Sequence, residues 1–322
     1  MLPKVCLKCV LALACLVATL AQSPYAPSAA IAGWTAGQAS EFGGPQEGWD
    51  IVYNATVRSG SCGYGTQDVR LWPFVGMAGV SRISPVSARP MGGCGTCLEV
   101  QCTDTRFNAC TGAGPITVTV LDTCASCNAT RINLFALAFQ EIGRIKFGTI
   151  AVEYRQVACK PPDNIEVRVD ARRPIDGGYL RLTLRNVAGD GGLTAVDIRG
   201  SANASAAGVD GVANAWQPMV NGYGAAWEAS RLQPDPAGGF DLRATNAVGE
   251  TIIISNAIPA YTTPRAALGS FFTSAQFTGT SLLSQRLAAS GKRSLHQARA
   301  IKAVTAASAQ HSARSRASPL EA

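Results

Sequence analysis

The stretch Gly93-Cys94-Gly95-Thr96-Cys97-Leu98-Glu99-Val100-Gln101-Cys102 carries three cysteines, and its second half alternates between apolar and polar residues. Such alternation is typical of a half-buried β-strand. Five more cysteines lie in the same region, and no cysteine follows the last of them: Cys62, Cys110, Cys124, Cys127 and Cys159. The sequence therefore predicts a cysteine-rich domain followed by a cysteine-free one.

Residues 1–21 have the parts of a secretory signal peptide. Lys4 and Lys8 flank the start of an apolar run over residues 10–20, which ends in small residues. A membrane anchor is the weaker interpretation, because a bilayer span needs roughly 20 apolar residues. Removal of this segment takes away three cysteines and turns the odd total of 11 into an even eight. We expect a secreted protein without a transmembrane segment, in a compartment that allows disulfides.

Two Cys-x-x-Cys pairs leave a zinc site as an alternative. Residues 94–97 and 124–127 have the local spacing that grips a tetrahedral metal. The gap between the two pairs is longer than in zinc ribbons, and an oxidising compartment favours disulfides. We therefore expect disulfides, no metal and no cofactor. The spacing alone leaves the pairing of the eight cysteines open.

The remaining patterns favour an all-β protein with two domains. Residues 116–121 and 150–157 alternate as half-buried strands do. Apolar spacing predicts one helix over residues 134–142, with Asn133 as its N-cap. The second half shows turn signals, including Gly189-Asp190-Gly191-Gly192, and short strands that favour a β-sandwich. We place the domain boundary at Lys160-Pro161-Pro162-Asp163, because consecutive prolines interrupt a strand.

The net charge of +7 is concentrated at the C-terminus. Residues 278–322 hold seven Lys and Arg residues against a single acidic residue, Glu321, so the preceding part is close to neutral. This distribution argues against a nucleic-acid footprint on the folded domains. The Ala- and Ser-rich tail is predicted to be disordered or weakly helical, and attraction to acidic wall polymers or membrane surfaces is the alternative to a solvated extension.

Three sequons fit a secreted glycoprotein, and they begin at Asn54, Asn128 and Asn203. Sequons also arise by chance, so each is a candidate glycosylation site. The sequon of Asn128 lies between Asp122 and Asn133, which are considered below.

Several motifs in their order resemble the expansin family. Those of the first half are similar to the first expansin domain: Ser61-Cys62-Gly63-Tyr64-Gly65, the 93–102 stretch, Thr119-Val120-Leu121-Asp122-Thr123 and the run over 152–159. Those of the second half resemble the second domain of β-expansins: Tyr179-Leu180-Arg181-Leu182, the run over 187–192, Trp216, Tyr223-Gly224-Ala225-Ala226-Trp227 and Gln276-Phe277. The resemblance implies a six-stranded double-psi β-barrel over residues 33–160. It also implies an immunoglobulin-like, cellulose-binding β-sandwich over residues 163–277.

The resemblance also implies a disulfide pairing. It joins Cys62 to Cys94, Cys97 to Cys159 and Cys102 to Cys110. Cys124 and Cys127 are then left to each other.

The barrel chemistry indicates binding rather than hydrolysis. An inverting glycosidase needs one carboxyl group to protonate the leaving oxygen and another to activate water. The resemblance places these two positions at Gly44 and Asn133, neither of which can act as a carboxylic acid. We expect a non-catalytic polysaccharide groove formed by Ser40, Phe42, Asp122 and Asn133. A turn role is the alternative for Asp122, and Glu47 stays open as a replacement acid.

Aromatic side chains of the second domain predict a carbohydrate platform. Flat rings can stack on pyranose rings while the sugar hydroxyls stay hydrated. Tyr179, Trp216 and Tyr223 occupy platform positions or their neighbours, whereas we assign Trp227 to the core.

Together these features predict a secreted monomer of the extracellular cell wall that binds cellulose or a related β-glucan. We expect it to loosen wall polysaccharide contacts without cutting chains. Two alternatives stay open. One is a weak endoglucanase or lytic transglycosylase on the same barrel, and the other is a carbohydrate-binding wall glycoprotein without loosening activity.

Overall fold

The computed structural model describes residues 33–43, 59–66, 77–82, 84–161, 163–173, 178–201, 215–232, 239–260 and 268–278. Several predictions from the sequence lie outside these residues: the signal peptide, Gly44, Glu47, Asn54, Asn203 and the tail from residue 279. In the described part no helix has the length and apolar character needed to cross a membrane.

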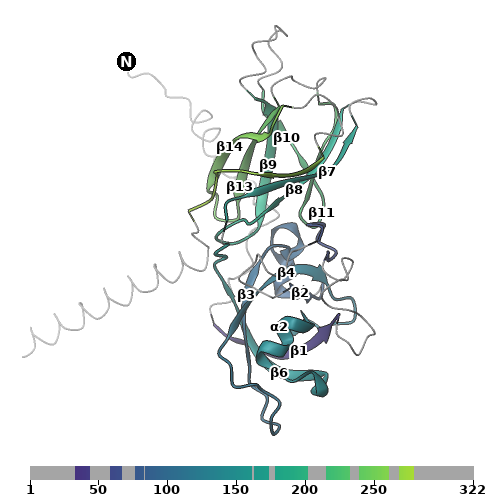
Figure 1. Ribbon diagram of the computed structural model, residues 1–322, viewed down its shortest axis with the longest axis vertical. Coiled ribbons are helices and arrows are strands. Elements are labelled where there is room, and N and C mark those ends of the chain that lie inside the picture. Colours follow the sequence, from purple (N-terminus) through teal and green to yellow (C-terminus); the bar gives the residue numbers. More distant parts are fainter. Residues whose placement is uncertain are drawn as a thin grey trace, which may run out of the picture.

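The first domain is a closed six-stranded barrel, as predicted, with strand order β1-β5-β2-β4-β3-β6 (Figure 1). Pairs β1·β5 and β2·β4 are parallel, and the other neighbours are antiparallel. The strands are β1 (Thr35–Phe42), β2 (Met77–Val80), β3 (Cys97–Cys102), β4 (Ile116–Thr123), β5 (Arg131–Phe135) and β6 (Thr149–Val157). The three alternating runs of the sequence lie in β3, β4 and β6, which confirms those strand predictions.

One side of each barrel strand faces a dry interior, as alternation requires. The largest side chains of this core are fully buried: Leu98, Ile132, Leu134, Phe139, Ile142, Ile150 and Tyr154. Short 3-10 helices connect the strands at η2 (Pro85–Ala88), η3 (Pro90–Gly93) and η4 (Ile145–Phe147).

The predicted helix exists, but its start was wrong. Helix α2 spans Ala136–Ile142, and Asn133 lies in β5 rather than at an N-cap. The cap position is Phe135, which makes no side-chain capping bond. Pairing of β5 with both β1 and β2 outweighs the local capping preference of asparagine, because tertiary contacts override a weak local signal.

The second domain is a sandwich of two antiparallel sheets (Figure 1). The five-stranded sheet has the order β11-β12-β8-β7-β15, and the four-stranded sheet has the order β10-β9-β13-β14. The strands are β7 (Glu166–Arg173), β8 (Tyr179–Arg185), β9 (Leu193–Gly200), β10 (Gln217–Pro218), β11 (Val220–Tyr223), β12 (Ala226–Ala229), β13 (Phe240–Asn246), β14 (Thr251–Ile258) and β15 (Gly269–Phe272). Inward-facing aliphatic residues of the two sheets form its core, among them Leu180, Leu182, Leu184, Ile198, Leu242 and Ile254.

The two domains share one hydrophobic cluster. Cys62, Tyr64 and Leu121 of the first domain belong to the same buried cluster as Leu184 and Val187 of the second. Burial of apolar surface across the junction stabilises the arrangement of the domains.

Backbone contacts also join the domains. The amide of Cys159 donates to the carbonyl of Gly189 over 2.7 Å, and the amide of Gly189 donates back over 3.1 Å. Gly95 and Gly191 approach so closely that a Cβ atom on either would collide with the carbonyl oxygen of the other. Both have positive φ angles, which glycine adopts at little cost.

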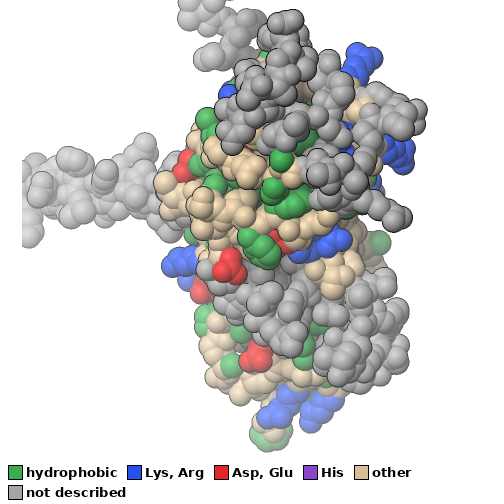
Figure 2. Space-filling view, turned by 45° about the horizontal axis from the view of Figure 1, so that its top comes forward, with side chains coloured by type: hydrophobic (Ala, Val, Ile, Leu, Met, Phe, Trp, Pro, Cys, Tyr) green, Lys and Arg blue, Asp and Glu red, His purple; other side chains and the backbone are tan. Residues whose placement is uncertain are grey.

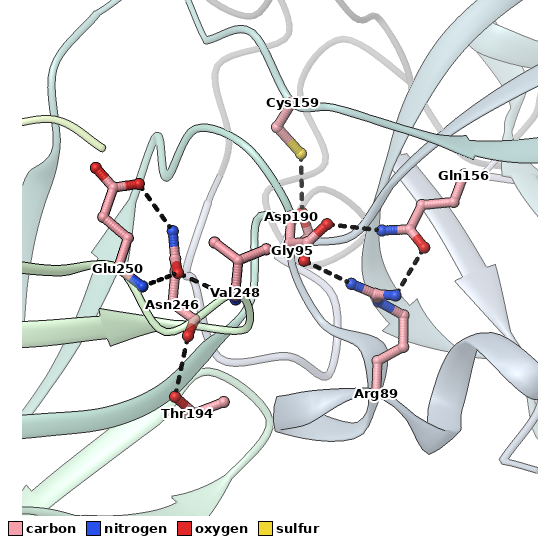
Figure 3. Close-up of polar contacts among 9 residues, drawn as sticks. All are labelled: Arg89, Gly95, Gln156, Cys159, Asp190, Thr194, Asn246, Val248 and Glu250. Atoms are coloured by element: carbon pink, nitrogen blue, oxygen red, sulfur yellow. Dashed lines mark hydrogen bonds and ion pairs between the residues drawn. The ribbon is translucent and has the colours of Figure 1, made fainter. Parts of the chain in front are cut away.

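A buried polar cluster completes the junction (Figure 3). The guanidinium of Arg89 lies 3.4 Å from a carboxylate oxygen of Asp190, and its other amino group donates to Gln156. The Gln156 amide in turn donates to Asp190 over 3.2 Å. The Asp190 side chain has no exposed surface. Charged and polar groups from both domains therefore meet away from water.

All eight cysteines of the described residues form disulfides within the first domain. The bonded pairs are Cys62–Cys94, Cys97–Cys159, Cys102–Cys110 and Cys124–Cys127. These are the pairs that the resemblance implies. Among the described residues no group of His, Cys, Asp and Glu side chains is arranged to hold a metal ion.

Candidate functional site

A row of residues crosses four neighbouring barrel strands. Ser40 of β1 pairs with Asn133 of β5. Gly79 of β2 pairs with Asn133 on one side and with Asp122 of β4 on the other. The Ser40 hydroxyl donates to the Asn133 side-chain oxygen over 2.9 Å. Gly79 has no side chain, and an ideal Cβ atom there would lie 3.7 Å from that of Asp122. The fold therefore brings together Ser40, Asn133 and Asp122, three of the four predicted groove residues.

A β-bulge orients Asp122. In β4, Val118 and Val120 face the barrel core, so strict alternation would turn Asp122 toward the same side. The pairing of β2 with β4 instead shifts between Ala78 and Gly79, which leaves one extra residue in β4. Such a bulge redirects the side chains that follow it. Asp122 thereby joins the row of Asn133.

The Asp122 carboxylate is held by backbone amides. Its Oδ1 accepts hydrogen bonds from the amides of Ser61 and Thr123, each over 2.8 Å. The Ser61 hydroxyl accepts a second bond from the Thr123 amide over 2.9 Å. These are the contacts of a turn aspartate, the alternative that the sequence left open. The side chain is nevertheless partly exposed in the row, and its groove role stays a prediction.

Phe42 extends the same face of β1. It pairs with Phe135, and the two rings pack with centroids 5.7 Å apart. Phe42 is partly buried against the shared cluster of the two domains. Glu41 pairs with Leu134 on the opposite face of the strand, so it does not join the row. Phe42 therefore forms an apolar wall next to the polar row.

Residues 59–66 connect the row to the second domain. Ser61 binds Asp122, while Gly63 lies against Tyr223, where a Cβ atom would be 3.0 Å from the tyrosine ring. The carbonyl of Cys62 accepts from the amide of Ala225 over 2.8 Å. The row of Asp122 and the ring of Tyr223 are therefore joined by a short, ordered backbone segment.

Tyr179, Arg181 and Tyr223 form a second feature, here called the tyrosine face. They lie on the outer side of the five-stranded sheet, and Arg181 is stacked with its guanidinium carbon 5.7 Å from the centre of the Tyr223 ring. Asp170 fixes Arg181 through a 2.8 Å hydrogen bond and raises the pKa of the guanidinium above its ordinary value. Tyr223 is 45% exposed.

Tyr179 lies at the other end of this face. The guanidinium carbon of Arg173 is 5.8 Å from its ring centre. Burial raises the pKa of Tyr179, and the nearby carboxylate of Glu228 raises it further. The face thus presents two rings with charged hydrogen-bonding groups between and beside them.

Trp216 does not lie with the two tyrosines. It precedes β10 at the edge of the four-stranded sheet, and the tyrosine face belongs to the other sheet of the sandwich. The predicted three-ring platform is therefore divided between opposite sides of the domain. Trp227 is 4% exposed and lies in the core, as predicted.

Asn128 is an exposed turn residue before β5. Its Oδ1 accepts from the amides of Thr130 and Arg131 over 3.1 and 2.9 Å. Its sequon lies between the Cys124–Cys127 disulfide and β5, and therefore close in sequence to both Asp122 and Asn133.

Two residues of the site were not predicted from the sequence. Ser61 holds Asp122, and Arg181 lies between the tyrosines. Arg181 is recognisable in principle, because it follows Tyr179 by two residues in an alternating strand and so shares its face. Ser61 meets Asp122 across a separation of 61 residues, and nothing local marks that contact.

Comparison with known proteins finds a family model for part of each domain. A family model described as "Expansin C-terminal domain" matches residues 165–259, and one described as "Lytic transglycolase" matches residues 87–154. The chain belongs to the expansin family.

Among the relatives of this expansin, Expansin-B1 of Oryza sativa subsp. japonica is 27% identical over 235 residues, which cover 70% of the chain and 79% of the relative. Pollen allergen Phl p 1 of Phleum pratense is 32% identical over 148 residues, or 43% of the chain and 53% of the relative. The chain thus spans about half the length of several curated relatives that it matches.

A solved structure shows the same fold. It is a mutant Clavibacter michiganensis expansin in complex with cellohexaose, with a TM-score of 0.54 and 19% sequence identity. The match covers 76% of this expansin and 98% of the bacterial chain. The two domains of this chain therefore have the fold of nearly the whole solved bacterial chain.

Proposed function

We propose that this expansin is a secreted wall protein that binds cellulose or a related β-glucan and loosens polysaccharide contacts without hydrolysis. The observation that carries the proposal is the connection between its two candidate binding features. Asp122 binds the amide of Ser61, and Gly63 of the same segment packs against Tyr223. A single extended polymer can therefore contact both domains.

The chemistry of the two features suits a neutral glycan. Tyrosine rings bury the apolar face of a pyranose, while Arg181 and Glu228 provide a donor and an acceptor for its hydroxyls. On the face shown in Figure 2, hydrophobic side chains lie beside charged ones rather than in one broad apolar patch.

The barrel row supports binding better than hydrolysis. Asp122 is a carboxylate, whereas Asn133, across Gly79, is an amide that neither donates a proton to a leaving group nor activates water. An inverting mechanism requires both roles. The bacterial relative crystallised with cellohexaose supports a β-glucan as the ligand class.

Hydrolysis or lytic cleavage is the second candidate, because the model that matches residues 87–154 carries the description "Lytic transglycolase". An extracellular location is supported by the four disulfides, which persist in oxidising compartments.

The test is a pull-down of the full chain on insoluble cellulose, with release of reducing ends and creep of loaded wall strips measured in parallel. Tyr179→Ala combined with Tyr223→Ala should weaken binding about 5- to 100-fold, as expected for the loss of two modest stacking contacts. Phe107→Ala is the matched control, because Phe107 is an aromatic residue of the barrel that is 89% exposed. Unchanged binding by the folded double variant would contradict the proposed site.

The same preparations separate loosening from cleavage. Asp122→Asn should reduce creep while leaving cellulose binding by the tyrosine face intact, because the asparagine side-chain oxygen can still accept the hydrogen bonds from Ser61 and Thr123 that hold the connecting segment. New reducing ends from the wild type that disappear in Asp122→Asn would show that the protein is an enzyme instead.

A further inference from the structure

Trp216 lies over the four-stranded sheet, on the side of the sandwich away from the tyrosine face. The guanidinium carbons of Arg199 and Arg243 are 4.3 and 4.9 Å from its ring centre. Arg199 belongs to β9 and Arg243 to β13, and β9 separates β13 from the edge strand β10 that follows Trp216. The indole must therefore extend from the edge over its neighbouring strand.

The two arginines beneath the indole are fixed in place. Arg199 pairs with Asp241 at 3.1 Å, and Arg243 pairs with Asp197 at 2.9 Å. Each pair joins directly opposite residues of β9 and β13. Asp241 also accepts hydrogen bonds from the Ser201 hydroxyl and the Asn256 amide, each over 2.8 Å. The ring thus rests on a rigid, hydrogen-bonded support.

This surface continues over the next strand. Ile253 of β14 pairs with Arg243 and is 53% exposed. Beyond it, the hydroxyls of Thr245 and Thr251 lie 2.9 Å apart. This outer side of the sheet is here called the tryptophan face. It has the partly exposed indole of Trp216 at one end and the exposed Ile253 at the other. The guanidinium and carboxylate groups of the two ion pairs lie between them.

The charge balance of the tryptophan face selects the class of ligand. Its two arginines are matched by two aspartates, so the face has no net charge to attract a polyanion or a polycation. An aromatic ring beside paired donors and acceptors fits a sugar, whose ring has an apolar face and whose hydroxyls both donate and accept.

We propose that the tryptophan face is a second binding surface for a neutral β-glucan chain, and that the sandwich is therefore bivalent. The choice of glycan rests on the proposed function, but the existence of the second surface rests on Trp216 and its arginine support. Because the tyrosine and tryptophan faces belong to different sheets, one straight chain cannot occupy both. Each molecule can thus bridge two chains, which raises avidity without new contacts.

The test is calorimetric titration of the full chain with soluble cellohexaose, together with sedimentation of suspended cellulose nanocrystals. The wild type should bind two molecules of cellohexaose and cross-link the nanocrystals. Trp216→Ala should bind one and lose cross-linking, and Tyr179→Ala with Tyr223→Ala should do the same. All three substitutions together should remove both sandwich sites, whereas the control Phe107→Ala should match the wild type.

The outcomes distinguish the two proposals. No binding by the wild type would overturn the proposed function. One site in the wild type, with unchanged affinity in Trp216→Ala, would overturn only the second surface. Ile253→Glu covers the case in which Trp216→Ala fails to fold, since Ile253 is exposed and the arginine stack stays intact. It should weaken the second site at least about threefold, and an unchanged second site in that variant would also refute the tryptophan face.

Discussion

Removal of the Asp190 carboxylate should destabilise the junction between the two domains. Asp190 is fully buried, pairs with Arg89 and accepts a hydrogen bond from Gln156 (Figure 3). Burial lowers the pKa of Arg89, and the neighbouring carboxylate opposes that effect. In Asp190→Ala the guanidinium stays buried without this partner, which costs about 3–5 kcal/mol of the free energy of unfolding.

A double-mutant cycle separates the ion pair from its surroundings. Arg89→Met alone should cost a similar amount, because it leaves the Asp190 carboxylate buried without its cation. The variant with both changes should cost less than the sum of the two by about 0.5–3 kcal/mol, the range found for residues in one network. Glu99→Ala is the control, because Glu99 pairs with Arg155 at the surface and should lose at most about 1 kcal/mol.

The measurement is urea unfolding, followed by circular dichroism and tryptophan fluorescence. The wild type should unfold in one transition, since one apolar cluster spans both domains. Asp190→Ala should show an earlier midpoint and separate transitions for the two probes. If Asp190→Ala behaves like Glu99→Ala, with one transition and a loss below about 1 kcal/mol, the buried pair does not hold the domains together.

Three further results are expected. Burial raises the pKa of Tyr64, and Arg185 opposes this with a smaller effect. The protonated Tyr64 therefore contributes fully to stability below the unfolded-state pKa of about 10, and this contribution declines at higher pH because the unfolded chain ionises first. Tyr64→Phe should reduce the loss of stability at alkaline pH, measured by unfolding at a series of pH values. Cys97→Ser with Cys159→Ser opens a separation of 62 residues and should cost about 4 kcal/mol, measured by denaturant unfolding; a loss below about 1 kcal/mol would contradict it. Asn133→Asp should not produce reducing ends from β-glucan, because the resemblance assigns the second carboxyl position to Gly44 and the amides of Ser61 and Thr123 already hold the Asp122 carboxylate; detectable cleavage would show that Asp122 and the new acid act as a pair.

The barrel strands were predictable because each buries one face. Leu98, Val118 and Ile150 occur in alternating runs, and each lies in the barrel core. The same logic predicts the wrong direction for Asp122, since its orientation depends on a register shift against β2 that has no local signal. Asn133 was misplaced for a related reason, because its strand pairs with segments distant in the sequence.

The junction between the domains was beyond sequence analysis. The stretch Gly189-Asp190-Gly191-Gly192 signals a turn, and turn aspartates are usually hydrated. Asp190 is buried because Arg89 and Gln156 of the other domain approach it, and that approach depends on the whole fold. Trp216 was grouped with the tyrosines for the same reason, because its sequence position does not tell which sheet it joins.

The order of the cysteines along the chain determines when each disulfide can first form. Strand β1 lies between β5 and β6, and Cys97 is bonded to Cys159, which is made 62 residues later. Cys102, Cys110, Cys124 and Cys127 are all synthesised in between, and each is an available thiol before the native partner of Cys97 emerges. Mixed disulfides exchange by thiolate attack. Oxidative folding of this domain therefore passes through species in which Cys97 is free or mispaired, and the refolding yield should rise with a catalyst of disulfide exchange.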